Sequence, residues 1–293
     1  MTEPQMSKLN EVILASQPLN YRKVIAFNFD KVTNQQFWNE AILDFYDFVM
    51  QYRIHESFIG IRVNLNEDDD IMLKLSVREI DIEEIDIFYQ ICCTHAKVVS
   101  FYYECNEEVF HYAGLKEISI LINGIKMFIT PNSFTQANHV MGNILYSKIN
   151  EIVKPNNKLI VYGRNSFHIA SQLNSKFKEV ICINPCPISY ADGLKSLKLH
   201  NFQWSTVKSK DLLVNFINGS ADDTTVIMSP GRNGYCLFDQ IDLLKLKNKQ
   251  FLYITCNEKS FKRDVKDNFN IKQNIMIELF PGTEYNEHII ELA

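Results

Sequence analysis

One cysteine stands where a reactive side chain would be useful. Cys256 and Asn257 directly follow an apolar run at 251–255 that is typical of a buried strand. In open α/β sheets, the loops at the ends of the strands line the crevice in which ligands bind. A thiolate there could act as a nucleophile, although Cys256 taken alone is interpreted more simply as a buried structural thiol.

Two other strand ends carry polar residues in a fixed order along the chain. The apolar run at 224–228 ends at Ser229, and Arg232 follows in the same turn. Downstream of Cys256, a further apolar run is followed by a Pro-Gly turn and Glu287. Taken singly, Arg232 could cap a turn and Glu287 could be a surface acid on an edge strand. Three such strand ends in one order point instead to chemistry gathered at one edge of a sheet.

Length and composition indicate a globular protein of two domains, or of one large α/β domain with an addition. The chain has 293 residues, of which 46% are hydrophobic, and it contains only 10 glycines and 8 prolines. No apolar run is long enough for a membrane span, and the first residues lack the pattern of a signal peptide. We therefore expect an intracellular, cytoplasmic location and no membrane partner.

Cysteine spacing and net charge further limit the classes of protein to which this chain could belong. The seven cysteines are scattered and form no CxxC pair, so we expect reduced thiols and no metal site. A formal net charge of −5 argues against a general nucleic-acid binder. Basic clusters at 22–23, 245–249 and 259–263 could still form a local patch, although a solvated face is the simpler interpretation.

Local patterns in the first part of the chain predict a small α+β domain over residues 1–130. The patterns favour a short helix at 6–14, a strand at 24–29 and an aromatic-rich helix at 34–52. A hairpin is expected across 57–77, followed by a helix from about 82 and a strand at 97–103. Asn123-Gly124, between two apolar runs, predicts a hairpin with a type I′ turn.

The remainder, residues 131–293, alternates between strand and helix patterns. A long linker helix is expected up to Pro155, capped by Ser133 or Thr135. Strands at 159–162, 179–183, 224–228, 251–255 and 275–279 alternate with helices near 167–175 and 189–199. This order predicts a mostly parallel, doubly wound sheet.

Four motifs together carry a resemblance to a known family. They are Ser133-Phe134-Thr135-Gln136-Ala137-Asn138, Ser229-Pro230-Gly231-Arg232, Cys256-Asn257, and Phe280-Pro281-Gly282-Thr283 with Glu287. In this order they resemble the motifs of the RNA (uracil-5) methyltransferases, nearest to the tRNA (uracil-5)-methyltransferases that make 5-methyluridine in the T-loop. The segment at 16–22 resembles the opening strand of that family. The resemblance implies a Rossmann-like class I methyltransferase domain preceded by a smaller α+β RNA-binding domain.

The resemblance also implies a mechanism and a set of partners. Cys256 would attack C6 of the uracil, C5 would take the methyl group of S-adenosylmethionine, and Glu287 would remove the C5 proton. Arg232, Asn257 and Arg22 would contact the uracil or the RNA, which we expect to be a tRNA with the target base flipped out.

The cofactor positions depart from the family pattern. The corresponding residues are Gln136, Tyr162, Gly163, Asn184 and Ser229. The turn after Tyr162 keeps only one glycine, Asn184 stands where the family has an acid for the ribose, and Ser229 replaces an aspartate. Two hypotheses therefore stay open. The first is an RNA uracil-C5 methyltransferase, with a protein partner that could complete its site. The second is a catalytically inactive relative that binds RNA or a protein as a folding or assembly factor.

Overall fold

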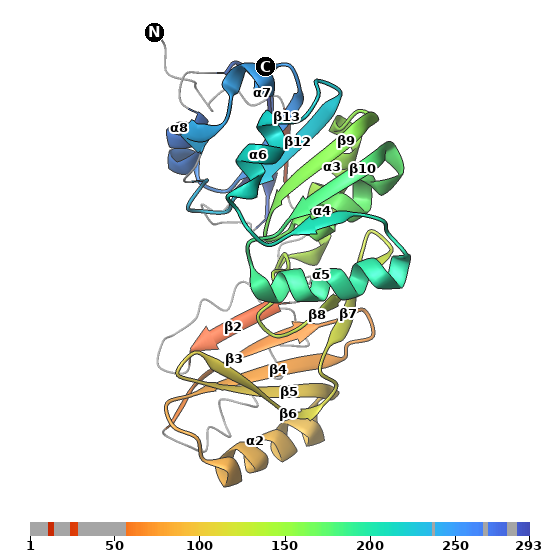
Figure 1. Ribbon diagram of the computed structural model, residues 1–293. Helices are drawn as coiled ribbons and strands as arrows, with labels where there is room; N and C mark the ends of the chain where they lie inside the picture. The colour runs from red at the N-terminus through yellow and green to blue at the C-terminus, as the bar shows by residue number, and fades with distance from the viewer. Residues whose placement is uncertain (1–10, 15–23, 29–56, 236–237, 266–268, 280–285) are drawn as a thin grey trace. The chain divides into compact units, whose positions relative to one another are not determined.

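The chain forms two compact units, each with its own sheet and hydrophobic core. A computed structural model describes residues 11–14, 24–28, 57–235, 238–265, 269–279 and 286–293 (Figure 1). One unit is Gln17–Val140, and the other combines Met1–Ser16 with Met141–Ala293. The chain thus enters the larger unit, leaves it to build the smaller one, and then returns.

The smaller unit is built on a five-stranded sheet in the order β2-β3-β4-β5-β6. All neighbouring strands are antiparallel except β4 and β5, which are parallel and are connected by helix α2. The elements are β2 (Val24–Asn28), β3 (Phe58–Leu65), β4 (Ile71–Val77), α2 (Ile82–His95), β5 (Val98–Cys105) and β6 (Glu108–Gly114). The predicted hairpin at 57–77 and the helix from residue 82 are confirmed.

Helix α2 covers one face of this sheet. Asp81 begins the helix, since its carboxylate accepts hydrogen bonds from the backbone amides of Glu83 and Glu84. Ile85, Phe88 and Cys92 follow at helical spacing and are buried, so the helix presents one apolar stripe to the strands. This packing forms the core of the smaller unit.

The opposite face of the same sheet is polar and holds the segment that follows a hairpin. Strands β7 (Ile118–Ile122) and β8 (Ile125–Ile129) form the predicted hairpin, with positive φ angles of 46° at Asn123 and 82° at Gly124. After β8, Arg62 donates a hydrogen bond to the carbonyl of Ser133 at 3.3 Å, and Lys74 donates one to Asn132 Oδ1 at 3.0 Å. The buried Lys74 and the half-buried Arg62 therefore fix the start of the motif that contains Gln136.

The larger unit is a twisted sheet of eight strands in the order β1-β14-β15-β13-β12-β9-β10-β11. All pairs are parallel except those of β15, which runs antiparallel to both of its neighbours. The strands are β1 (Glu11–Ile13), β9 (Asn156–Gly163), β10 (Phe177–Ile183), β11 (Ser205–Val207), β12 (Thr224–Ser229), β13 (Gln250–Thr255), β14 (Ile271–Glu278) and β15 (Asn286–Leu292).

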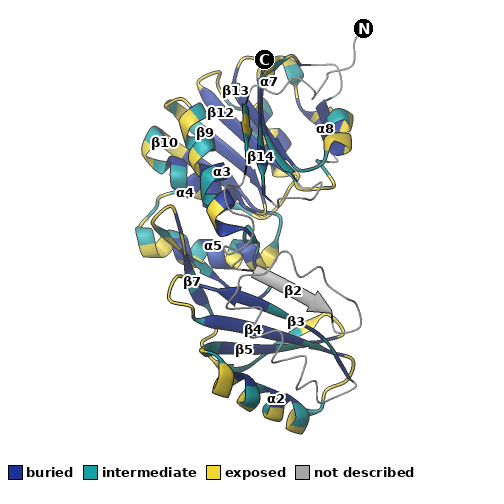
Figure 2. Cartoon of the chain, turned by 180° about the vertical axis from the view of Figure 1, so that it is seen from behind, coloured by how far each residue is buried: buried dark blue, intermediate teal, exposed yellow. Residues whose placement is uncertain are grey.

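Helices lie on both faces of the large sheet, as the doubly wound prediction requires. Helix α6 lies before the sheet in Figure 1, and α3 lies before it in the reversed view of Figure 2. The central strands are buried on both faces (Figure 2). The helices are α3 (His139–Ile152), α4 (Ser166–Leu173), α5 (Pro187–His200), α6 (Leu212–Asn218), α7 (Leu243–Lys247) and α8 (Glu258–Val265), with short 3₁₀ turns η2 (Asn174–Lys176) and η3 (Phe238–Gln240). The predicted Rossmann-like fold class, with its parallel-dominated sheet, is confirmed.

Two local predictions are wrong, each for a physical reason. The pattern at 6–14 favours a helix, but residues 11–13 form the edge strand β1, because their backbone pairs with β14 and Val12 and Ile13 are β-branched. The linker helix begins at His139 and not near Ser133, whose hydroxyl instead accepts a hydrogen bond from the backbone of Thr130 at 3.1 Å in a turn. The predicted helix at 34–52 lies outside the described residues, and the domain boundary at residue 130 stays a prediction.

We expect Gly193→Ala to destabilise the larger unit. Gly193 lies on α5, and a Cβ atom there would come within 2.3 Å of the buried ring of Phe167. Overpacking of this kind lowers the free energy of unfolding by about 1–3 kcal/mol, although alanine normally favours a helix by about 1 kcal/mol. Urea denaturation measures the change, with exposed Lys198→Ala on the same helix as the control. An equal or higher stability of Gly193→Ala would contradict the packing described here.

Candidate active site

Cys256 lies at the carboxyl end of the central strand β13. The strand residues before it, from Phe251 to Thr255, are at most 1% exposed, whereas Cys256 is half-buried. The backbone of Cys256 is therefore anchored in the core while its thiol lies near the surface of the sheet edge. The strand end predicted from the sequence is confirmed.

Antiparallel pairing with β15 brings Glu287 to the same edge. The register pairs Ile254 with Ile289 and Thr255 with His288, so one further step brings Cys256 opposite Glu287. Directly opposed residues in an antiparallel pair have Cβ atoms about 4.5–5.5 Å apart. A thiol and a carboxyl from distant parts of the sequence thus become neighbours through a backbone register.

Arg232 completes a group of three interacting side chains. Burial raises the pKa of the Cys256 thiol and the charge of Glu287 raises it further, whereas a hydrogen bond from Arg232 and its positive charge lower it. Burial raises the pKa of Glu287 from 4.5 to about 7, and the charge of Arg232 opposes this shift. Near neutral pH, Glu287 therefore exchanges a proton readily, which suits a general acid or base.

Asn257, which directly follows Cys256, connects the end of β13 to the turn that contains Arg232. Its side-chain amide donates a hydrogen bond to the carbonyl of Arg232 at 2.8 Å, and its Oδ1 accepts one from the backbone of Lys259 at 3.0 Å. The second contact caps the start of α8. Asn257 thus positions the backbone of Arg232.

A buried aspartate that the sequence analysis missed stabilises the turn that follows Arg232. Asp264 on α8 is 3% exposed, and its Oδ2 accepts hydrogen bonds from the Tyr253 hydroxyl at 2.6 Å and the Tyr235 backbone at 2.5 Å. Its Oδ1 accepts from Arg263 at 2.6 Å, and Arg263 also donates to the carbonyl of Asn233 at 2.7 Å. The signal in the sequence was its spacing, because Asp264 stands three residues after Phe261 on the apolar face of a helix.

The turn after β9 contains a glycine at a point where two strand ends come very close together. Gly163 has φ of 143°, and a Cβ atom there would lie 2.3 Å from the carbonyl oxygen of Ser229 on β12. Only glycine fits this close approach of two strand ends. Asn165 Oδ1 lies 3.0 Å from the same Cβ position, and within the described part of the chain this buried acceptor has no hydrogen-bond partner.

Asn184, predicted to contact the cofactor, has a structural role in the fold. Its side chain is fully buried, its Nδ2 donates to the carbonyl of Arg164 at 3.0 Å, and its Oδ1 accepts from the backbone of Cys186 at 3.0 Å. These bonds join the turn after β9 to the start of α5. Both polar ends of the amide are therefore engaged within the protein.

The other predicted residues fall into different places. Tyr162 is 5% exposed and its ring packs edge-on against Tyr235 at 5.0 Å, so its side chain belongs to the core. Ser229 is buried at the end of β12, and Gln136 is half-buried in the smaller unit. Arg22 lies outside the described residues. The structure brings together Cys256, Glu287, Arg232 and Asn257, and their roles stay predictions.

A second thiol, Cys186, has the opposite electrostatic setting. Burial alone would raise the pKa of Cys186, but hydrogen bonds from Ser189 and the charge of Arg164 bring this pKa below its usual value. It precedes α5, about as far buried as Cys256. Cys186 is therefore the natural control for thiol chemistry at Cys256.

The described residues hold neither a metal-binding cluster nor a membrane-spanning helix. Across those ranges, no three histidine, cysteine, aspartate or glutamate side chains cluster as a metal site would require. None of the helices described here is both long and apolar enough to cross a membrane.

Curated relatives of this chain are RNA methyltransferases by name. A Fusobacterium nucleatum protein named as an uncharacterized RNA methyltransferase is 29% identical over 246 residues, covering 80% of this chain and 52% of the relative. A Bacteroides thetaiotaomicron protein of the same name is 22% identical over 274 residues, covering 82% and 60%. The chain spans about half the length of the curated relatives it matches. No protein-family model matches it.

Solved structures share the fold. The Pyrococcus abyssi tRNA (uracil-54, C5)-methyltransferase, solved with S-adenosyl-L-homocysteine, matches with a TM-score of 0.75 and 18% identity over 97% of this chain and 78% of that one. The tRNA m1G37 methyltransferase of M. jannaschii matches with a TM-score of 0.55 and 14% identity, covering 89% and 80%.

The sheet order, the glycine turn after β9 and these matches define a Rossmann-like methyltransferase fold. Within that class, the chain is related to the RNA methyltransferases. The predicted similarity to RNA methyltransferases is confirmed by the names of the relatives, and the chain shares the fold of a solved tRNA (uracil-54, C5)-methyltransferase.

We expect Glu287→Gln to stabilise the protein at alkaline pH. Because the pKa of Glu287 is raised to about 7 in the folded state, ionisation above that pH opposes folding, and the cost is lost as pH falls toward 4.5. A shift of this size corresponds to at most roughly 3 kcal/mol. Thermal unfolding at about pH 5 and about pH 8 measures the difference. Exposed Glu179→Gln on β10 serves as the control, and a gain independent of pH would contradict the burial of the Glu287 carboxyl.

Proposed function

We propose that this chain carries the catalytic centre of an S-adenosylmethionine-dependent RNA methyltransferase that acts on C5 of a uracil, with tRNA as the substrate class. The observation that carries the proposal is the electrostatic interaction of Cys256 with Arg232 and Glu287 at the carboxyl ends of the strands. Its support includes the relatives named as RNA methyltransferases and the fold of a solved tRNA (uracil-54, C5)-methyltransferase.

Cys256 is the nucleophile in this proposal. Once deprotonated, its sulfur adds to C6 of the uracil and pushes electron density onto C5, which is otherwise a poor nucleophile. Burial and Glu287 hold the thiol protonated in the resting protein, and Arg232 provides the opposing positive charge. Arg232 therefore stabilises the thiolate when it forms.

Glu287 completes the reaction as the general base. After C5 has been methylated, its carboxylate accepts the C5 proton while the bond from sulfur to C6 breaks. The products are the free Cys256 thiolate, a 5-methyluracil and the demethylated cofactor, S-adenosylhomocysteine. A pKa of about 7 allows Glu287 to accept this proton near neutral pH and to release it afterwards.

The residues at the carboxyl ends of the strands fit the methionine part of S-adenosylmethionine better than its ribose. Gly163 allows close backbone approach, and the buried Asn165 Oδ1 beside it is an acceptor suited to an ammonium group such as that of the methionine moiety. When bound, S-adenosylmethionine supplies an electrophilic methyl group. The ribose half lacks the usual carboxylate, and Asn184 does not replace it, because its amide is engaged with Arg164 and Cys186.

A covalent complex with RNA tests the nucleophile. With S-adenosylmethionine and a T-loop hairpin containing 5-fluorouridine at the target, we expect a denaturation-resistant adduct, because a fluorine at C5 cannot be removed as a proton. Cys256→Ala should form no adduct, whereas Cys186→Ala should form as much as the wild type. Gel electrophoresis and mass spectrometry measure the adduct. An adduct that survives Cys256→Ala, or that requires Cys186, would exclude the proposed nucleophile.

A second candidate function is a catalytically inactive relative that binds RNA or a protein partner. The specific observation in its favour is the internal bonding of Asn184, which removes the ribose-binding side chain from the crevice. In this alternative, the Cys256 and Glu287 pair would be a remnant of the reaction, and a protein partner could supply the missing contacts.

Calorimetric titration with S-adenosylmethionine separates the two candidates. The enzyme requires measurable, saturable binding by the wild type, whereas no heat up to millimolar cofactor with RNA still bound would favour the inactive relative. We expect Asn184→Asp to give no gain in affinity, because the carboxylate cannot donate a hydrogen bond to the Arg164 carbonyl and lowers stability by about 1–3 kcal/mol. A marked gain from Asn184→Asp would show that residue 184 does face the ribose.

A further inference from the structure

Three stacked aromatic rings extend from the core toward the surface at the amino ends of the parallel strands of the large sheet. We call them the ladder. Phe202 stacks on Trp204 at 4.8 Å with an interplanar angle of 10°, and His200 stacks on Phe202 at 5.2 Å and 23°. On the inner side, Trp204 contacts the buried Phe167 ring at 6.3 Å. The ladder residues His200, Phe202 and Trp204 are each half-buried.

The backbone holds this ladder in place. Asn201 ends α5 in a left-handed conformation with φ of 55°, and the amide of Phe202 donates to the carbonyl of Leu197 at 3.1 Å. The Trp204 indole donates to Asn174 Oδ1 at 2.7 Å, just before the edge strand β11 begins. The rings are therefore ordered before any partner binds, which reduces the entropy cost of binding.

The ladder lies in a basic stretch of an acidic protein. The whole chain has a net charge of −5, yet residues 193–210 contain four lysines and no acidic residue. Those lysines, Lys195, Lys198, Lys208 and Lys210, are all exposed. Of the flanking acids, Asp192 is buried and Asp211 is exposed. Positive charge and stacked rings thus coincide on one surface.

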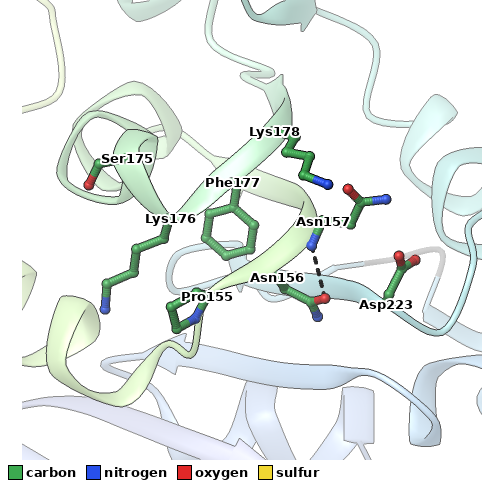
Figure 3. A pocket seen from close by; sticks show the side chains of 8 residues that line it. All are labelled: Pro155, Asn156, Asn157, Ser175, Lys176, Phe177, Lys178 and Asp223. Atoms are coloured by element: carbon green, nitrogen blue, oxygen red, sulfur yellow. Dashed lines mark hydrogen bonds between the residues drawn. The ribbon is translucent and has the colours of Figure 1, made fainter.

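An open groove of about 540 Å³ lies along the same edge of the sheet (Figure 3). It is lined by Lys176, Lys178, Ser175 and the residues that begin β9 and β10, with Asp223 as its acid. Asn174, which holds Trp204, immediately precedes Ser175. The Lys176 ammonium donates to the carbonyl of Val153 at 2.7 Å, so Lys178 is the groove cation with fewer described contacts.

We propose that the His200–Phe202–Trp204 ladder and its lysines bind a single-stranded segment of the RNA substrate. A base would stack on the outer rings while the lysines contact phosphates, a combination that binds single strands without reading their sequence. Cys256, Ser229 and Gly163 all lie at the carboxyl ends of their strands, so this surface is at the opposite edge of the sheet. The proposal rests on RNA being the substrate, as proposed above, and adds a second binding surface remote from the reacting base.

Fluorescence of Trp204 tests the stacking directly. The chain has two tryptophans, so Trp38→Phe leaves Trp204 as the only reporter. Titration with a single-stranded oligouridine of about 12 nucleotides should quench its emission at low salt. Saturation of RNA binding, followed by anisotropy of a labelled oligouridine, without any change in Trp204 emission would overturn the proposal.

Affinity measurements test the residues. We expect Phe202→Leu to weaken oligouridine binding at least about tenfold. Lys195→Gln with Lys198→Gln should reduce the slope of log affinity against log salt by about 0.7 for each phosphate that the protein no longer neutralises. Lys245→Gln with Lys247→Gln on α7 removes the same charge elsewhere and should leave the affinity unchanged.

The lysine variants alter only exposed side chains, so they keep the test valid if Phe202→Leu lowers stability. The proposal would be overturned if Phe202→Leu and the Lys195→Gln, Lys198→Gln variant both bound oligouridine with the affinity of the wild type. The 5-fluorouridine adduct at Cys256 is measured separately, so failure of this surface and failure of the proposed reaction are distinguishable.

Discussion

The antiparallel insertion of β15 between β13 and β14 is the constraint on which the candidate site depends. All other neighbouring strands of the large sheet are parallel, and a parallel strand in this position would carry its residues past Cys256 in the other direction. Ile289 and Ile290 point to opposite faces of the sheet and are both fully buried, so a slip by one residue would exchange the two faces and disrupt the packing on each. The core thus fixes which side chain faces the thiol.

The electrostatic effects on Cys256 and Glu287 oppose one another, so the resting protein does not favour the reactive thiolate. Arg232 stabilises negative charge on both Cys256 and Glu287, whereas burial opposes it at each group and the charge of Glu287 also opposes it at Cys256. Only one of the two acidic groups can ionise cheaply at a time. The raised pKa of Cys256 favours the protonated thiol, which reacts more slowly with oxidants and alkylating agents than a thiolate does.

The parts of the fold that depend on local residue preferences could be predicted from the sequence. The parts that depend on pairing between distant segments could not. Asn123-Gly124 defines a turn by its own backbone preferences, and the hairpin follows. Strand β1 depends on a partner near the other end of the chain, so the helical pattern around it misled the prediction. At the site, the order of motifs indicated Cys256 and Glu287, but the supporting Asp264 and the inward-turned Asn184 depend on hydrogen bonds that only the folded chain defines.

The pairing of β1 with β14 has a consequence for the order in which the protein can be made. Glu11 is synthesised well before its partner Ile275, because the whole of the smaller unit lies between them in the sequence. The smaller unit, which is continuous in sequence, can fold in the meantime, while the larger sheet waits for its last strands. A fragment lacking β1 would leave β14 as an uncovered edge able to pair with other chains. Soluble expression of truncated forms therefore depends on a few residues far from any functional group.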